Sequence, residues 1–338
     1  MKKKILVTRT LSLFPDIEDR LSVWFDVEFS RGGKHAPDHF RDALRGKSGV
    51  LLGGGERIDE ALLSSLGDSA LKAVCIPAAG YNNVDIAALT RAGIIVTNAP
   101  GLVDETVADF AWGVLLATAR RVKEAEDWLQ EGEWKESAGS RFFGIDVYGK
   151  TLGIIGMGRI GQGIAKRGFG FNARILYNNR HRLPAETEQA CRAEYATRDE
   201  LLAGSDFVIL CLPYTPESHH LIGPSEIKKM KKEAILINVA RGGLIDEVAL
   251  ADAIREERLA GASLDVFEQE PTVYEGLLGL PNVLLTPHIA GATEASQHAM
   301  ARLAADNLVA ALGYGPDAGR PPSILNPELL EDPAGKGR

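Results

Sequence analysis

Cysteine is scarce in this sequence. The chain of 338 residues contains only Cys75, Cys191 and Cys211, an odd number without the spacing of metal ligands. We therefore expect neither a disulfide framework nor a cysteine-bound metal, and we expect a reducing compartment, the cytoplasm. The three thiols are predicted to be small buried apolar side chains.

Long hydrophobic runs and strong positive charge are also missing. The apolar stretch ILV in MKKKILVTRT is too short for a signal-peptide core, and no run approaches the length of a membrane span. The net charge of -8, with acidic residues spread along the chain, argues against nucleic acid or a membrane as the partner. A small-molecule ligand is expected instead.

Strand-like and helical segments alternate along the chain. The first series begins with KILVTR, DIEDRLSVWF and DVEFS, and a second begins after Gly149 with TLGIIGMG, ARILYNN and DFVILCLP. Such alternation predicts an α/β protein with two doubly wound parallel sheets, one flavodoxin-like and one of the Rossmann type. We place the first domain at residues 1–102 and 289–325, with a second domain inserted at 103–288.

Three further segments are predicted around these domains. Apolar residues at helical spacing indicate one long helix from about Glu105 to Gln130. A helix from Thr293 to Leu312 is expected to return to the first domain. The chain beyond Gly313 is rich in proline and glycine, so it is expected to be loosely ordered, as a tail over residues 326–338 above all.

A glycine pattern opens the second domain. In TLGIIGMGRIG, Gly156, Gly158 and Gly161 follow an apolar strand and begin a helix. The first glycine permits a tight turn, the second lets the backbone approach a pyrophosphate, and the third lets the helix pack on the strand. Placed between a strand and a helix in an alternating region, this pattern predicts a dinucleotide site.

The next strand, ARILYNN, ends without the acid that usually binds the ribose of NAD. No acidic residue occurs from Gln162 to Ala185, and Asn178, Asn179, Arg180 and Arg182 stand at the expected place. Asparagine and arginine can bind a 2′-phosphate, which an acid would repel. We therefore predict NADPH as the cofactor, with NADH less favoured and the two arginines as the main phosphate partners; the alternative is that these arginines belong to an ordinary solvated loop.

Arg241, Glu270 and His288 each follow a strand-like run. A guanidinium pairs bidentately with a carboxylate, and an imidazole can give or take a proton near neutral pH. A carboxylate on the other ring nitrogen orients the imidazole and favours its charged form. The three residues together predict reduction of the keto group of a small 2-keto acid. The adjacent His219 and His220 are read as loop residues.

The sequence resembles the D-isomer-specific 2-hydroxyacid dehydrogenase family over nearly its whole length. The similar segments are GYNNVDIAAL, ETVADFAWGVLLATAR, KTLGIIGMGRIG, INVARGGLIDEVAL, LDVFEQEP and NVLLTPHIAGAT. Within that family it looks most like glyoxylate/hydroxypyruvate reductases of the bacterial 2-ketogluconate reductase type. The resemblance implies a homodimer, D-configured products and a substrate site between the domains.

The resemblance also assigns residues. It gives Arg241 to the substrate carboxylate, Glu270 to orienting the histidine and His288 to acid/base catalysis. It adds substrate-binding loops at Ala79 with Gly80 and at Gly54, which are equally well explained as plain turns. Cofactor contacts are implied for Thr106, for the amides of Arg159 and Ile160, and for Pro213, Ala240, Asp265 and Gly291, with Asp265 accepting from the nicotinamide carboxamide.

Two other functions remain open beside the reduction of glyoxylate, hydroxypyruvate and 2-ketogluconate. A D-lactate-type or branched 2-keto acid reductase would prefer an apolar group beyond C2. A nucleotide-sensing corepressor would share the fold, but no added partner-binding region is visible. The physiological 2-keto acid is not readable from the sequence, because pocket size depends on loop shape.

Overall fold

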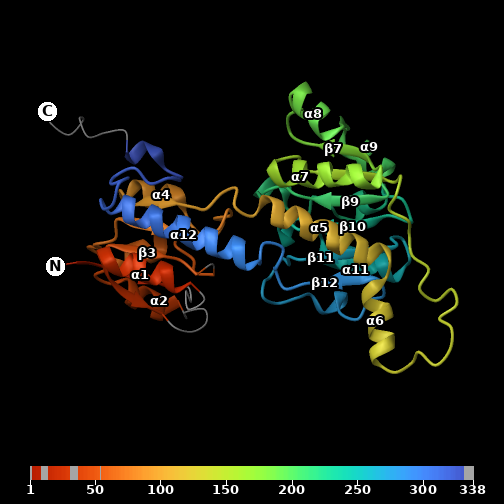
Figure 1. Ribbon diagram of the computed structural model, residues 1–338, viewed down its shortest axis with the longest axis horizontal. Helices are drawn as coiled ribbons and strands as arrows, with labels where there is room; N and C mark the ends of the chain where they lie inside the picture. The colour runs from red at the N-terminus through yellow and green to blue at the C-terminus, as the bar shows by residue number, and fades with distance from the viewer. Residues whose placement is uncertain (1, 9–13, 31–36, 54, 331–338) are drawn as a thin grey trace. The chain divides into compact units, whose positions relative to one another are not determined.

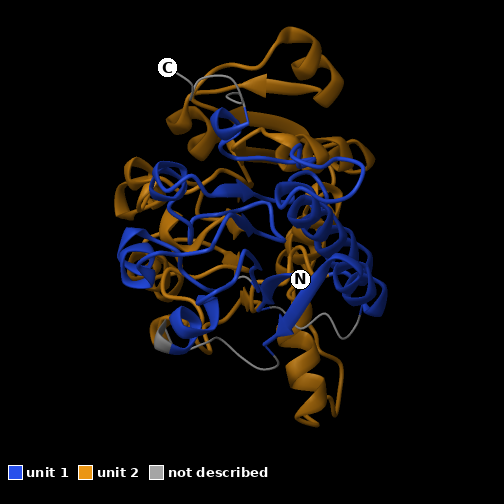
Figure 2. Cartoon of the chain, turned by 90° about the vertical axis from the view of Figure 1, so that its left-hand side faces the viewer, with its two compact units in different colours: residues 1–103, 293–338 blue, residues 104–292 orange. Residues whose placement is uncertain are grey.

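The chain folds into two compact units. The structure, a computed structural model, describes residues 2–8, 14–30, 37–53 and 55–330. Residues 1–103 and 293–338 form unit 1, and residues 104–292 form unit 2. Both ends of the chain contribute to unit 1 (Figure 2). The boundaries between the two units lie after Val103 and after Ala292, close to the predicted boundaries after residues 102 and 288.

Unit 1 contains a sheet of five parallel strands. Their order, β2-β1-β3-β4-β5, is that of flavodoxin-like folds, as predicted. The strands are β1 (Lys3–Val7), β2 (Phe25–Phe29), β3 (Gly49–Leu51), β4 (Ala73–Cys75) and β5 (Ile95–Thr97). The helices are α1 (Pro15–Trp24), α2 (Pro37–Leu44), α3 (Glu60–Leu66), α4 (Ile86–Arg91) and α12 (Glu294–Ala311).

Helix α12 completes the core of unit 1. Its N-cap is Thr293, whose hydroxyl accepts from the Ser296 amide, and its buried residues include Ala301, Ala304 and Leu308. A Cβ on Gly49 would lie 2.7 Å from Leu308 Cδ1, so β3 and the helix approach each other closely here, and a larger residue would require the leucine side chain to shift. The segment predicted to return to the first domain is therefore part of its core.

The segment after α12 is packed, contrary to the expectation of a loose tail beyond Gly313. Asn326 is fully buried. Its Oδ1 accepts from the Val96 amide at 2.9 Å, and its Nδ2 donates to Thr90 Oγ1 at 3.0 Å and to the Ile94 carbonyl at 2.9 Å. Because these bonds satisfy backbone groups at the edge strand β5, they hold the described part of the tail in place.

Unit 2 contains seven parallel strands in the order β12-β11-β10-β9-β6-β7-β8, which confirms the Rossmann prediction (Figure 1). The strands are β6 (Thr151–Ile155), β7 (Arg174–Asn178), β8 (Ala193–Tyr195), β9 (Phe207–Leu210), β10 (Ile235–Asn238), β11 (Gly261–Leu264) and β12 (Val283–Leu285). The helices are α5 (Asp104–Ala119), α6 (Val122–Gln130), α7 (Arg159–Arg167), α8 (Ala185–Cys191), α9 (Arg198–Gly204), α10 (Pro224–Ile227) and α11 (Glu247–Arg255).

The strand register aligns the carboxyl ends of this sheet. Ile155 pairs with Asn178 on one side and with Leu210 on the other, and Asn238 pairs with Leu210 and with Leu264. The segments that follow these residues therefore leave the sheet at one edge. The order reverses between β6 and β9, where open α/β sheets bind ligands.

The single helix predicted from Glu105 to Gln130 is wrong, because the chain breaks between α5 and α6. Arg121 has a left-handed backbone with φ of 51°. The Ala119 carbonyl accepts from the Ile145 amide at 2.8 Å instead of continuing the helical pattern. Apolar periodicity runs through both helices, so it could not reveal a break that a distant segment stabilises.

The three cysteines were expected to be free and buried. Cys75 and Cys191 are buried, as predicted, whereas Cys211 is only partly buried; all three are free thiols. Burial raises the pKa of the Cys75 and Cys211 thiols to about 12.

Within the described ranges, no helix combines the length and the apolar character that a bilayer crossing requires.

Candidate active site

Two of the three loop glycines are required by packing. Gly156 has φ of 101°, and a Cβ there would lie 2.6 Å from the Cys211 carbonyl carbon. A Cβ on Gly161 would lie 2.5 Å from the Gly156 carbonyl oxygen. These contacts explain the tight turn after β6 and the close approach of α7 to that strand.

Gly158 has no such packing reason. It is the N-cap of α7, and a Cβ built on it would have no atom within 4 Å among the described residues. The open space therefore lies in front of the helix N-terminus, where the amides of Arg159 and Ile160 begin the first turn. A glycine there leaves room for a pyrophosphate, and the helix dipole favours an anion, so these residues fit a dinucleotide.

The two asparagines at the end of β7 bind neighbouring backbone. Asn179 Oδ1 accepts from the Met157 amide of the glycine-rich loop at 2.7 Å, and Asn178 Nδ2 donates to the Ala196 carbonyl at 2.8 Å. With its oxygen used by the loop, Asn179 has an amide donor group to offer a ligand. A donor suits a phosphate, whereas a ribose hydroxyl is best bound by an acceptor.

The two arginines beyond them differ in their surroundings. Arg182 donates from Nε and Nη2 to Glu188 at 2.8 and 2.9 Å, and hydrogen bonds from Arg182 and Tyr177 lower the pKa of Glu188 to about 2. Arg180 is exposed, and within the described part of the chain it forms no ion pair shorter than 4.0 Å, although its charge contributes to the lowered pKa of Glu217. Arg180 is thus better available for a ligand than Arg182.

Arg241 follows β10 in a turn that buried Asn238 supports. Asn238 Nδ2 donates to the Arg241 carbonyl at 2.8 Å, and its Oδ1 accepts from the Ala240 amide at 3.0 Å. Burial lowers the pKa of the Arg241 guanidinium, and the nearby charge of Glu270 opposes this effect. An arginine remains a cation in either case. Asn238 was not among the predicted site residues; its only signal was a polar residue at the end of an apolar strand.

Glu270 and His288 form a direct pair. Glu270 Oε2 lies 2.8 Å from His288 Nδ1, and its Oε1 accepts from the Phe267 amide at 3.0 Å. Burial alone would raise the pKa of Glu270, but the bonds from His288 and Phe267 and the charges of His288 and Arg241 outweigh it and lower the pKa. The His288 side chain is half exposed, so its second nitrogen, Nε2, remains for a substrate.

Asp265 holds the loop that carries His288. It is 1% exposed, and its carboxylate accepts from Thr286 Oγ1 at 2.7 Å and from the amides of Ile289 and Ala290 at 2.8 Å each. These bonds restrain His288, whose own backbone is left-handed with φ of 55°. The structure thus assigns Asp265 contacts that the sequence did not suggest, while acceptance from a carboxamide stays a prediction.

The remaining predicted residues are divided between the units. Thr106 lies on α5, and Pro213, Ala240 and Gly291 follow β9, β10 and β12 in unit 2. In unit 1, Ala79 and Gly80 follow β4, and the Ala79 carbonyl accepts from Asn98 Nδ2 at 2.9 Å. Gly54 lies outside the described residues.

The chain is similar to known dehydrogenases and reductases. A sequence model described as "D-isomer specific 2-hydroxyacid dehydrogenase, NAD binding domain" matches residues 112–290. Glyoxylate reductase of Thermococcus gammatolerans is 43% identical over 336 residues, 98% of each chain. Glyoxylate/hydroxypyruvate reductase B of Enterobacter sp. is 43% identical over 315 residues, 92% of this chain and 95% of that one.

A solved structure is similar over nearly the whole chain. It is the NADPH-dependent glyoxylate/hydroxypyruvate reductase from Sinorhizobium meliloti, in complex with NADP and malonate. The TM-score is 0.82 at 31% sequence identity, with 96% of this chain and 97% of that chain covered.

Proposed function

The chain belongs to the D-isomer-specific 2-hydroxyacid dehydrogenase family, an NAD(P)-dependent group of oxidoreductases, and we propose that it reduces glyoxylate and hydroxypyruvate with NADPH. The observation that carries the proposal is the Glu270–His288 pair, 2.8 Å apart, near Arg241 at the carboxyl edge of the nucleotide-binding sheet. Relatives of both kinds, glyoxylate reductases and glyoxylate/hydroxypyruvate reductases, support this substrate class.

Each residue of the trio has one task in the reaction. Arg241 pairs with the substrate carboxylate, which fixes the keto carbon relative to the bound nicotinamide. The reduced nicotinamide supplies the hydride when it is bound. His288 gives a proton from Nε2 to the carbonyl oxygen, and Glu270 keeps Nδ1 hydrogen-bonded, so that the ring stays oriented and its protonated form is favoured. The product is a 2-hydroxy acid of D configuration where C2 is chiral.

The preference for NADPH is supported by the end of β7. No acid stands there, Asn179 offers a donor, and the exposed Arg180 can pair with a 2′-phosphate. The Sinorhizobium meliloti relative, described as NADPH-dependent, supports the same choice. We infer that Arg180 is the main phosphate partner, because Arg182 is engaged by Glu188.

We further propose a homodimer formed through α6 and the segment that follows it. None of the residues of α6 is buried, and Val122, Leu129, Trp134 and Phe143 are 52%, 49%, 64% and 76% exposed. Within unit 2, α6 and the chain beyond it project from the sheet (Figure 1). Several large apolar side chains exposed on one projecting segment are typical of a surface that a partner covers.

Initial rates on a substrate panel test the activity. Glyoxylate, hydroxypyruvate, 2-ketogluconate, pyruvate and a branched 2-keto acid are compared with NADPH and with NADH. We expect the highest kcat/KM for glyoxylate or hydroxypyruvate with NADPH. A preference for pyruvate or the branched acid would support a D-lactate-type or branched-acid reductase instead, and nucleotide binding without turnover would support a corepressor.

The variant His288→Ala tests the role of the histidine as proton donor in the same assay. Loss of the proton donor should lower kcat by about 10²–10⁴-fold, while NADPH binding measured by fluorescence is retained. His39→Ala, which changes an exposed histidine of α2, is the matched control. Turnover of His288→Ala close to the wild-type value would contradict the assigned role.

A further inference from the structure

The side chains of two adjacent histidines beyond β9 lie on the same side of the backbone. His219 ends the 3-10 turn η2 (Pro216–Ser218), and His220 has a left-handed backbone with φ of 51°, held by a 2.8 Å bond from its amide to the Gly243 carbonyl. In an extended chain such neighbours would point to opposite faces. Here the rings stack with their centroids 3.8 Å apart and 24° between their planes.

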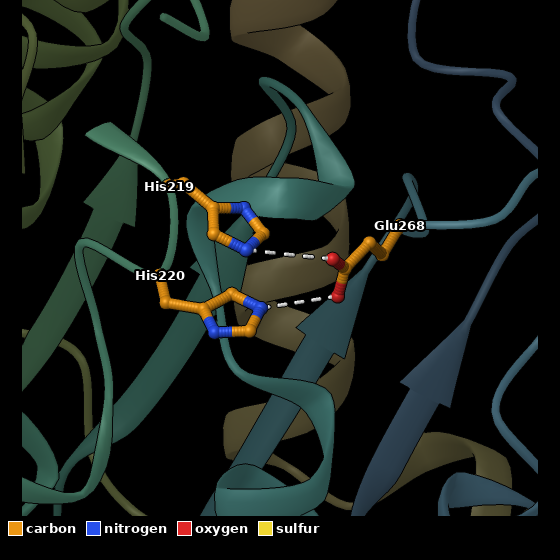
Figure 3. Close-up of side chains that lie close together, drawn as sticks. All are labelled: His219, His220 and Glu268. Atoms are coloured by element: carbon orange, nitrogen blue, oxygen red, sulfur yellow. Dashed lines mark hydrogen bonds and ion pairs between the residues drawn. The ribbon is translucent and has the colours of Figure 1, made fainter. Parts of the chain in front are cut away.

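Glu268 brings a carboxylate to these rings from another loop. Its Oε2 lies 3.1 Å from His220 Nε2, and its Oε1 lies 3.8 Å from His219 Nε2 (Figure 3). The Glu268 amide donates to Oε1 of buried Glu247 at 2.8 Å, which fixes the loop on α11. Two imidazoles and one carboxylate, separated by 48 residues of sequence, thus converge on one point.

The spacing of these atoms suits a metal ion. One ligand atom from each residue lies within 4.8 Å of the other two. With bonds of about 2.0–2.2 Å, ligand atoms around a tetrahedral ion lie about 3.3–3.6 Å apart. His220 Nε2 lies 3.1 Å from one carboxylate oxygen of Glu268 and His219 Nε2 lies 3.8 Å from the other, so each nitrogen is close to that spacing from a carboxylate oxygen. We propose that His219, His220 and Glu268 bind a divalent transition metal ion of the Zn²⁺ class.

The donor types select the class of ion. Imidazole nitrogen suits Zn²⁺, Ni²⁺ and Co²⁺, whereas Mg²⁺ and Ca²⁺ take oxygen ligands. Tyr214 Oη lies 3.2 Å from His219 Nδ1. When Nδ1 donates its proton to this hydroxyl, the lone pair of Nε2 points toward Glu268, as a metal ligand requires. The three side chains are partly exposed, so an ion can enter and water can complete its coordination.

The proposed metal site is separate from the candidate active site. Glu268 and Glu270 are separated by one residue, but Glu268 faces His220 whereas Glu270 faces His288. A bound ion would join the loop after β9 to the loop after β11. The expected effect is greater thermal stability of unit 2 in the presence of the ion, whether or not the proposed reduction is correct.

Calorimetric titration of Zn²⁺ into the full-length chain, purified without a histidine tag and treated with chelator, tests the site. We expect one ion per chain and a Tm that rises with Zn²⁺ concentration. His219→Ala, His220→Asn and Glu268→Gln should each weaken binding by at least about tenfold and remove the rise in Tm. Asparagine is chosen at position 220 because it tolerates a left-handed backbone.

Two control variants test whether Zn²⁺ binds at other histidines of the chain. His39→Ala and His288→Ala should bind Zn²⁺ as the wild type does, since neither changes a proposed ligand. If Zn²⁺ bound to the wild type and to His220→Asn with the same affinity, and circular dichroism showed that both proteins are folded, the proposal would be overturned. Loss of Zn²⁺ binding in His288→Ala would overturn it as well, because the ion would then lie at the catalytic pair.

Discussion

A few carboxylates of this protein hold other groups of the candidate site in place. Asp265 restrains the loop of His288 with three hydrogen bonds, and Glu270 binds the histidine ring itself. Glu188 plays the same part for Arg182. Since each buried or paired carboxylate fixes its partner, side chains that look equivalent in the sequence have different freedom to bind a ligand.

Arg180→Ala is expected to raise KM for NADPH by about tenfold to a hundredfold, because a charge-assisted hydrogen bond to the 2′-phosphate contributes about 1.5–3 kcal/mol. KM for NADH should not change, since NADH has no such phosphate. Steady-state kinetics with both cofactors measures this. Arg182→Ala is the matched control, and its smaller effect follows from its pairing with Glu188. An unchanged cofactor preference in Arg180→Ala would remove Arg180 from the site.

Glu270→Gln is expected to lower turnover and to change how stability depends on pH. The pKa of Glu270 is lowered in the folded chain, so its ionised form stabilises the fold above its ordinary value of 4.5. That contribution is lost as pH falls through the lowered pKa. The difference in free energy of unfolding between wild type and variant, about 1 kcal/mol at neutral pH, should therefore shrink in acid. Denaturation at several pH values measures it, and a difference independent of pH would contradict the pairing.

Among the secondary structure elements, the turn from β6 into α7 shows how one motif combines two requirements. Gly156 and Gly161 are needed because a Cβ would collide with backbone atoms. Gly158 is different, because a Cβ there would have no atom of the described residues within 4 Å, which leaves the room that the proposed pyrophosphate site needs. The same glycine pattern therefore contains both a folding constraint and a binding constraint.

Substitution of single glycines separates these constraints. Gly158→Ala should keep the wild-type Tm but weaken NADPH binding by at least about tenfold, since its methyl group would occupy the approach of the pyrophosphate. Gly161→Ala should destabilise the chain by about 1–3 kcal/mol through overpacking against Gly156. Thermal melting and fluorescence titration measure the two effects. Wild-type nucleotide affinity in Gly158→Ala would contradict the proposed site.

For the whole molecule, α6 with the segment after it is a part of the described chain that exposes several large apolar side chains. These side chains remain exposed in the single chain, whereas Asn326 is held to unit 1 by buried hydrogen bonds. Apolar surface is stabilised by removal from water, which a second copy of the chain would provide.

Replacement of Leu129 and Phe143 by aspartate should convert the proposed dimer into a monomer, because the new charges would have to be buried at the interface. Light scattering after size-exclusion chromatography measures the mass. Val23→Asp, at a residue of α1 that is 64% exposed, is the matched control and should leave the dimer intact. A monomeric wild type at micromolar concentration would exclude this interface.

Local sequence patterns were sufficient to predict much of the fold and of the candidate site. Alternating strands and helices predict the two parallel sheets, because burial of both faces imposes apolar strands on any such fold. The glycines of GMGRIG and the positions of Arg241, Glu270 and His288 at strand ends follow from residue type and short-range order. Neither the break at Arg121 nor the packing of Asn326 against β5 could be predicted, since each depends on hydrogen bonds between segments distant in the sequence.

The partners of polar side chains were decided only by the tertiary structure. Glu188 engages Arg182, Asp265 binds the His288 loop, and Glu268 meets His219 and His220 because parallel strands deliver separate loops to one edge of the sheet. A hydrogen bond or a metal site depends on distances of a few ångströms between such loops. Sequence patterns encode which residues reach that edge, and the packing of the chain selects which of them touch.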